Sequence, residues 1–255
     1  MIYGLYLSAQ GAQAQSARLD VIANNLANAS TTSFKRDLAV FQSHPPYDVE
    51  HGSPGDGPEG WDNHNGGVSL AGVKTDFSNG PLLKTDGPYD VALTGQGFFQ
   101  VTDDREQFLT RNGQFTVNEE GELVNDTGLH VLTDAGGTIL VPGNAISFEA
   151  GADGTLSAVL DDGSRTSLGR LAVVQPASLD SLEKVGDSLY RSRTTVAPAG
   201  PQTMVRQGYL EGSGANSVSD MLEMIQATRA FETNVNMIKH QDEALSRLLQ
   251  TAGSR

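Results

Sequence analysis

Two heptad patterns, one at each end of the chain, most constrain what this sequence can fold into. In both, small or apolar residues recur at alternating spacings of three and four, which is the repeat of a helix that packs along one seam. The N-terminal seam is Ile2, Leu5, Ala9, Ala12, Ser16, Leu19, Ala23 and Leu26. The C-terminal seam is Met221, Met224, Thr228, Phe231, Val235, Ile238, Asp242, Leu245 and Leu249. The patterns predict helices over about residues 3–28 and 218–250.

The start of the C-terminal helix carries its own signal. Ser217 followed by Asp220 has the spacing of a capping box, and the preceding GSGAN run is a flexible breaker. We therefore expect Ser217 to cap this helix.

The small residues of both seams limit how much a single helix pair can gain by packing. Burying eight or nine mostly small side chains contributes on the order of 10 kcal/mol. Ordering the backbone of one such helix costs roughly 25 to 50 kcal/mol, which helical hydrogen bonds only partly offset. Packing each helix on several neighbours in an assembly is the more stable arrangement. A hairpin within one chain is the plain alternative, and the two can coexist on different faces.

Between the helices, strand-like segments alternate with turn dipeptides, and the chain has 29 glycines. The hairpin signals are Arg111-Asn112-Gly113, Glu120-Gly121, Gly136-Gly137 and Asp162-Gly163. We predict an α+β protein in which long terminal helices, forming a coiled-coil core, flank a central β-rich domain. Its predicted parts are residues 1–42, an irregular Pro/Gly-rich arm at 43–67, the β domain at 68–210 and the C-terminal helix at 211–255.

Charge and composition exclude several classes of function. The formal charge of −14, with no segregated basic patch, argues against nucleic-acid binding. The chain has no cysteine, so disulfides and thiolate chemistry are excluded. No window approaches the roughly 18 to 20 apolar residues that cross a bilayer, and the N-terminus lacks the basic start of a cleavable signal peptide. These features alone predict a soluble cytoplasmic protein.

Three stretches resemble one known family. DVIANNLANASTTSFKR (Asp20 to Arg36) closely resembles the N-terminal signature of flagellar rod and hook proteins. Gly208 to Leu249, with LEGS before the helix and RAFE within it, looks like the terminal helix of the same family. DVALTGQGFFQV (Asp90 to Val101) and Phe108 to Gly128 resemble its β domain.

The resemblance implies a structural subunit of the flagellar basal-body rod, of proximal or distal type, that self-assembles through its terminal helices and transmits torque. It implies other rod and hook subunits and the flagellar type III export apparatus as partners. It moves the expected location to the periplasmic rod, reached without a cleaved signal peptide. The residues expected at subunit interfaces are Leu19, Ala23, Asn24, Asn25, Leu26, Asn28, Phe231, Val235, Ile238, Asp242 and Leu245. For the three asparagines, satisfying the backbone at the helix end is the plain alternative.

The sequence offers little that points to catalysis, a cofactor or a metal. Gly95-Gln96-Gly97 lacks the third glycine of a dinucleotide fingerprint, so we expect a turn or bulge that leads Phe98 and Phe99 into the β core. Three histidines of the arm, His44, His51 and His64, match no standard ligand spacing. We predict a non-enzymatic protein without a cofactor.

Two other classes of function remain open at this point. A secreted adhesin or binding module would carry its β domain on a helical stalk, but a stalk favours large seam residues, whereas this seam is rich in alanine and interrupted by Asp242. An enzyme would need a cluster of titratable groups in the β domain.

Overall fold

The computed structural model describes residues 2–43, 67–103 and 105–253. The chain divides into two compact units. The first comprises Met1–Ala27, Arg36–Asp76 and Ala215–Arg255, and the second comprises Asn28–Lys35 and Phe77–Gly214. Each unit is therefore built from stretches that lie far apart in the sequence.

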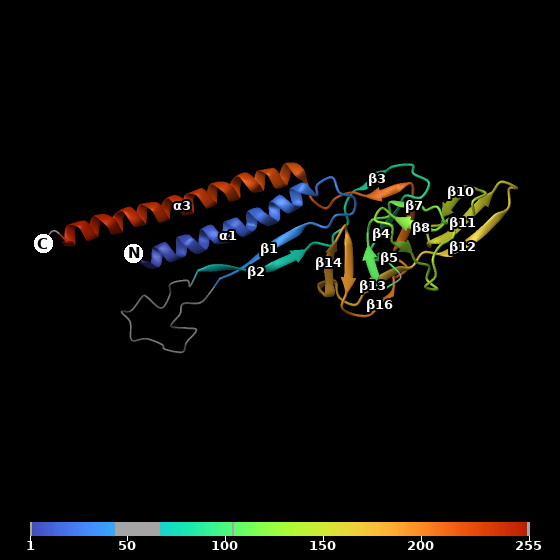
Figure 1. Ribbon diagram of the computed structural model, residues 1–255, viewed down its shortest axis with the longest axis horizontal. Helices are drawn as coiled ribbons and strands as arrows, with labels where there is room; N and C mark the ends of the chain where they lie inside the picture. Colours follow the sequence, from blue (N-terminus) through green and yellow to red (C-terminus); the bar gives the residue numbers. More distant parts are fainter. Residues whose placement is uncertain (1, 44–66, 104, 254–255) are drawn as a thin grey trace. The chain divides into compact units, whose positions relative to one another are not determined.

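The first unit contains both terminal helices, α1 (Ile2–Ala27) and α3 (Ser217–Gly253), which confirms the two predicted helices. They run antiparallel along each other, since Gly4 lies against Gln241 and Gly11 against Asn234 (Figure 1). Neither helix, within the described residues, has a stretch apolar and long enough to span a membrane.

A two-stranded antiparallel ribbon completes the first unit. It consists of β1 (Asp37–Ser43) and β2 (Val68–Thr75), and α1 packs against both strands (Figure 1). The sequence assigned residues 68–75 to the β domain, whereas here they pair with a strand that follows the N-terminal helix.

Asn216, not Ser217, caps α3. Its Oδ1 accepts hydrogen bonds from the backbone amides of Val218 and Ser219, both at 3.1 Å, and its carbonyl accepts the first helical bond from Asp220. The predicted capping box at Ser217 is therefore wrong by one residue, because asparagine satisfies the same free amides and Ser217 already has helical geometry.

The second unit is built of short strands and one 3-10 turn. In chain order these are β3 (Leu82–Lys84), β4 (Val91–Thr94), β5 (Phe98–Thr102), β6 (Gln107–Thr110), β7 (Phe115–Val117), β8 (Leu123–Asn125), β9 (His130–Val131), β10 (Ala145–Ala150), β11 (Thr155–Leu160), β12 (Arg165–Arg170), β13 (Val173–Pro176), η1 (Leu179–Ser181), β14 (Leu182–Gly186), β15 (Leu189–Ser192), β16 (Val196–Pro198), β17 (Met204–Gln207) and β18 (Tyr209–Glu211). The largest sheet has the order β14-β15-β6-β5-β9-β8-β7, with β13 and β16 beside β5. The other strands of this unit form the three-stranded sheet β10-β11-β12 and the pairs β17-β4 and β18-β3.

The core of this unit confirms the expectation for Gly95-Gln96-Gly97. The segment turns the chain between β4 and β5 with positive φ at Gly95 (98°) and Gly97 (149°), conformations that glycine adopts without strain. Phe98 and Phe99 follow it and are buried on opposite sides of β5. Two hydrophobic clusters thus pack on the two faces of one strand.

Three of the four predicted hairpin turns are confirmed. Glu120-Gly121 joins the paired strands β7 and β8, Asp162-Gly163 joins β11 and β12, and Gly136-Gly137 lies between the bridge partners Leu132 and Thr138. The prediction at Arg111-Asn112-Gly113 is wrong, because β6 and β7 do not pair.

The residues of this failed hairpin have other roles. The side chains of Arg111 and Asn112 are buried. Gly113 is needed because the backbone passes close to β4: a Cβ atom there would lie 1.7 Å from the carbonyl oxygen of Val91. A close approach therefore explains this glycine better than a turn does.

Candidate assembly surface and its buried anchor

The helix pair of the first unit packs through glycine. A Cβ atom on Gly4 would come within 3.1 Å of the Gln241 side chain, and one on Gly11 within 3.1 Å of Asn234. One heptad further along α1, Arg18 forms an exposed ion pair with Glu223 at 3.6 Å. The seven-residue spacing of Gly4, Gly11 and Arg18 defines the line on α1 that faces α3.

The predicted N-terminal seam lies beside this line on the surface of α1, so only part of the seam is covered. Every second position of the seam is at least half-buried in the chain, namely Leu5, Ala12, Leu19 and Leu26. The alternate positions Ala9, Ser16 and Ala23 are exposed. These three small residues, which we call the α1 outer stripe, leave a smooth face on the helix.

The C-terminal seam divides in the same way. Its covered positions are Met224, Phe231, Val235, Ile238 and Leu245, and its exposed positions are Met221, Thr228, Asp242 and Leu249. Asp220, Ala227 and Gln241 precede three of the exposed positions and are covered in their place, and Asn234 is covered beside Val235. Asp242 therefore lies outside the helix pair and not within it.

Large apolar side chains cluster on the exposed face of α3. Val218, Met221, Leu222 and Ile225 are each more than half exposed and follow the i, i+3, i+4, i+7 spacing of one helix face. We call them the α3 outer patch. A soluble monomer has no reason to expose such a row, whereas an assembling subunit does.

The three signature asparagines have different surroundings. Asn25 is buried, its Nδ2 donates to the Asp37 carbonyl and its Oδ1 accepts from the Asp37 amide, both at 2.8 Å. This pair of bonds holds the end of α1 to the start of β1. Asn24 is exposed and Asn28 is half-buried, with Oδ1 of Asn28 accepting from the Thr31 hydroxyl at 3.2 Å.

The residues that follow the asparagines enter the second unit and end in a buried ionic cluster. Lys35 donates from Nζ to Glu211 Oε1 at 2.6 Å, and both side chains are 1% exposed. Arg111 lies on the other carboxylate oxygen, with Nη1 3.5 Å from Glu211 Oε2. We call Lys35, Arg111 and Glu211 the clasp.

Backbone groups pair with Lys35 and Glu211 in the clasp, whereas Nε of Arg111 is buried without a hydrogen-bond partner. Lys35 Nζ also donates to the carbonyl of Ser78 at 2.7 Å, and the amide of Gly80 donates to Glu211 Oε1 at 2.8 Å. Burial lowers the pKa of Arg111, and the charge of Glu211 opposes that shift. Buried charges with this degree of pairing are tolerated, and removing one partner is costly.

Ser33, in the signature segment that contains Lys35, binds the backbone of the two other clasp residues, Arg111 and Glu211. Its amide donates to the carbonyl of Glu211 and its hydroxyl to the carbonyl of Arg111, each at 2.8 Å. Ser33 has a positive φ of 57°, an uncommon conformation for a residue other than glycine. These contacts hold the segment in a shape that its local sequence does not prefer.

Sequence reasoning missed the clasp. Lys35 and Glu211 lie within the SFKR and LEGS stretches that carry the family resemblance, so the motifs contained the signal. Charged side chains are seldom fully buried, and nothing in the spacing of residues 176 apart pairs them.

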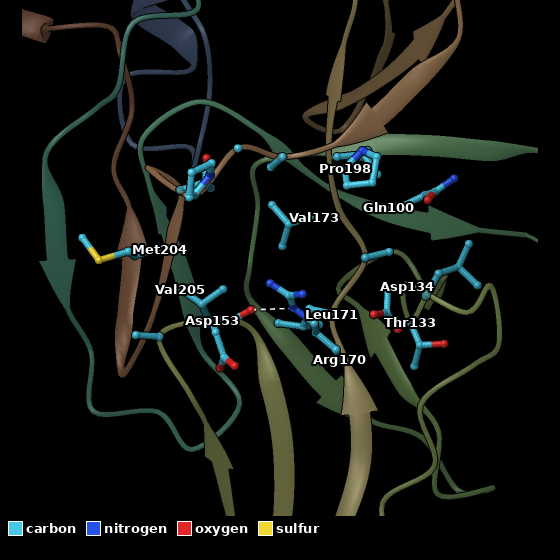
Figure 2. Close-up of a pocket in the computed structure, with 18 of the residues that line it drawn as sticks. Gln100, Thr133, Asp134, Asp153, Arg170, Leu171, Val173, Pro198, Met204 and Val205 are labelled. Carbon is cyan, nitrogen blue, oxygen red and sulfur yellow. Dashed lines mark hydrogen bonds between the residues drawn. The ribbon is translucent and has the colours of Figure 1, made fainter.

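The second unit also contains an open cavity of about 710 Å3 (Figure 2). Its walls carry Leu171, Val173, Pro198, Met204 and Val205, together with the charged residues Asp134, Asp153 and Arg170. Nε of Arg170 donates to the carbonyl of Asp153 at 2.7 Å. The lining has no histidine, serine or lysine, so it offers a place for apolar contact and lacks the usual nucleophile and base pair.

No group of three potential metal ligands occurs in residues 2–43, 67–103 and 105–253. The histidines considered above, His44, His51 and His64, lie outside the described residues.

Helices that expose stripes of small and apolar residues are typical of a subunit that assembles with its neighbours. Comparison with known proteins identifies the family of this chain. Residues 5–35 match the family model described as flagella basal body rod protein. Residues 92–158 match the flagellar hook protein FlgE/F/G D1 domain, and residues 206–251 the flagellar basal body rod FlgEFG protein C-terminal region.

Full-length relatives agree with these matches. The chain is 36% identical over 244 residues to the flagellar basal-body rod protein FlgF of Caulobacter vibrioides, covering 94% of this chain and 93% of the relative. It is 32% identical over 260 residues to the flagellar basal-body rod protein FlgG of Bacillus subtilis, covering 98% of each. The chain therefore belongs to the flagellar basal-body rod protein family. It is a structural subunit of the flagellar basal-body rod, and its relatives include both FlgF and FlgG.

Proposed function

We propose that this subunit polymerises through its terminal helices into the helical rod and transmits torque along it for motility. The observation that carries the proposal is the α3 outer patch, a row of large apolar side chains on a helix whose other face is already packed. Because the intrachain contact uses one face only, the second face is available for neighbouring subunits in a coiled-coil core.

The charge distribution supports an outward position for the β unit. The second unit has 10 Lys and Arg against 18 Asp and Glu, which suits a surface in contact with water and ions. The described part of the first unit carries nearly balanced charge, so its helices can approach one another closely without strong repulsion.

The proposed interface keeps the residues predicted from the sequence. Ala23, Asn24 and Asp242 lie on exposed helix surface, and an Arg or Lys of a neighbour would pair with Asp242. Asn25 contributes from inside the chain by holding β1 to the end of α1. The half-buried members share their remaining surface with the neighbour: Leu19, Leu26, Asn28, Phe231, Val235, Ile238 and Leu245.

The proposal includes the route to the rod and the partners met there. The subunit is exported through the flagellar type III apparatus without a cleaved signal peptide and assembles in the periplasm with other rod and hook subunits. Its relatives carry the names of two rod proteins, so its place as proximal or distal rod is decided by locating it in isolated basal bodies with immunogold labelling.

The test replaces the apolar patch without touching the intrachain seam. Leu222→Lys combined with Ile225→Lys places two charges on exposed positions. We expect unchanged thermal unfolding of the purified subunit and loss of its incorporation into basal bodies, together with loss of swimming.

The matched control is Thr166→Lys, an exposed position of β12 in the β unit. We expect this variant to incorporate and to support swimming. Normal basal bodies and motility in the Leu222/Ile225 variant would contradict the proposal.

A further inference from the structure

The chain passes between the two units at four peptide links. These are Ala27–Asn28, Lys35–Arg36, Asp76–Phe77 and Gly214–Ala215. Any force that the chain itself carries between the helices and the β unit must enter the β unit at these links.

All four links are anchored, on the β-unit side, within a few residues of the clasp. Lys35 is itself the last residue before one link, and its Nζ holds the carbonyl of Ser78, close after the third. Glu211 lies shortly before the fourth link and binds the amide of Gly80.

Further hydrogen bonds join the anchored segments to one another. The Ser213 hydroxyl donates to the carbonyl of Asn28, just after the first link, at 2.8 Å. The Gly214 amide donates to the carbonyl of Phe34 at 2.8 Å. Lys184 Nζ donates to the carbonyl of Lys35 at 2.7 Å and lies over the Phe34 ring, 4.7 Å from its centroid. The four links therefore leave the β unit from one connected patch.

We infer that the clasp is the mechanical joint of the subunit, the place where torque passes between the terminal helices and the β unit. The inference rests on the proposed function, since it specifies how that torque is carried within one subunit. Lys35, Arg111 and Glu211 are positioning residues, because they act by holding the links in place within the subunit.

The clasp suits this role because its charges are buried and paired with one another. A carboxylate and an ammonium shielded from water attract each other more strongly than an exposed pair, and salt does not screen them. Separating the two charges would leave each unpaired in the protein interior, which solvates charge poorly. The joint therefore resists small displacements. Surface ion pairs of the same unit, such as Arg193 with Glu183, exchange with water and cannot do this.

The first test compares two destabilised subunits of equal thermal stability. Glu211→Gln removes the shared carboxylate charge, and Leu156→Ala or Leu156→Val opens the core in β11, a strand that pairs with β10 and β12 and contains none of the links. The Leu156 substitution is chosen so that its midpoint of thermal unfolding equals that of Glu211→Gln.

Basal bodies carrying each variant are isolated, counted, and sheared at a series of rates. We expect similar numbers of rods before shear and, for Glu211→Gln only, at least a several-fold higher fraction of broken rods at a given shear rate. Equal breakage of the two variants would overturn the inference.

The second test needs no rod and covers a Glu211 variant that assembles poorly. Hydrogen exchange is measured on the full purified chain, with Lys35→Arg as a milder variant that keeps the charge. We expect the amides of Ser33 and Gly214 to exchange at least tenfold faster together in Glu211→Gln and, to a smaller degree, in Lys35→Arg, but not in the Leu156 variant. Exchange rates of the Ser33 and Gly214 amides that change independently of each other would overturn the inference that the clasp is a joint. Failure of the unaltered subunit to enter rods would instead overturn the proposed function.

Discussion

The ammonium group of Lys35 and the carboxylate of Glu211 meet at 2.6 Å in the interior of the β unit, although 176 positions separate them in the chain. Lys35 follows the N-terminal signature segment and Glu211 precedes the C-terminal helix. One buried ion pair thus joins the two ends of the chain where they enter the same unit.

Glu211→Gln should lower the free energy of unfolding by about 3 to 5 kcal/mol, because it leaves the Lys35 and Arg111 charges buried without their counterion. Urea denaturation of the full chain measures this. The control is Glu183→Gln, which breaks an exposed pair with Arg193 and should change the same quantity by less than about 1 kcal/mol. Similar effects of the two substitutions on the free energy of unfolding would contradict a stabilising role of the clasp.

Gly11→Leu should destabilise the helix pair by about 1 to 3 kcal/mol, since even a Cβ atom at this position lies 3.1 Å from Asn234 and the larger side chain forces the helices apart. Loss of helical circular dichroism on heating measures the change. Gln13→Leu, at an exposed position of the same helix, is the control and should leave the transition unchanged, because glutamine and leucine have similar helix propensities. An unaltered transition in Gly11→Leu would argue against this α1–α3 contact.

Asn25→Ala should cost about 2 to 4 kcal/mol, because both backbone groups of Asp37 lose the side-chain amide that pairs with them. Faster hydrogen exchange of the Asp37 amide would locate the effect. Ser16→Ala, on the exposed stripe of α1, is the matched substitution and should leave that exchange rate as it is. If Asn25→Ala leaves the Asp37 amide equally protected, the bond does not hold in solution.

Acid should weaken the β unit through three turn aspartates whose pKa lies below the ordinary 3.8. Hydrogen bonds from the amides of Glu106 and Arg105 lower the pKa of Asp103. Hydrogen bonds from the hydroxyl and amide of Thr155 lower the pKa of Asp153. Hydrogen bonds from Ser164 lower the pKa of Asp162. The unfolded chain then binds more protons than the folded one, so the stabilisation is present above pH 3.8 and is lost as the pH falls through the folded pKa values.

The measurement is the free energy of unfolding between about pH 5 and about pH 2 for the original chain and for the combined Asp103→Asn, Asp153→Asn and Asp162→Asn variant. Asparagine keeps the acceptor oxygen of each turn, so we expect a shallower pH dependence and little change near neutral pH. An identical slope in both proteins would exclude these carboxylates as the acid-sensitive groups.

Local pattern was enough to predict the terminal helices, the aromatic pair Phe98 and Phe99 in the core, and three of the turns, because each depends on residues a few positions apart. The family resemblance of the two ends, carried by ANNLAN and LEGS among other motifs, was also readable directly. Where the hairpin prediction failed, a distant contact had replaced a local one. Arg111-Asn112-Gly113 looks like a hairpin turn, but Val91 packs against Gly113 and Glu211 binds Arg111.

What the sequence by itself determined is the extent of the terminal helices, the presence of strands between them and, through its motifs, the rod family. Only the tertiary structure decided which face of each helix is covered, since α1 packs on both a helix and a ribbon and a heptad pattern describes one seam. It also decided that Lys35 and Glu211 are buried partners, because the pairing of two charges far apart in the chain depends on how the backbone returns to the same place.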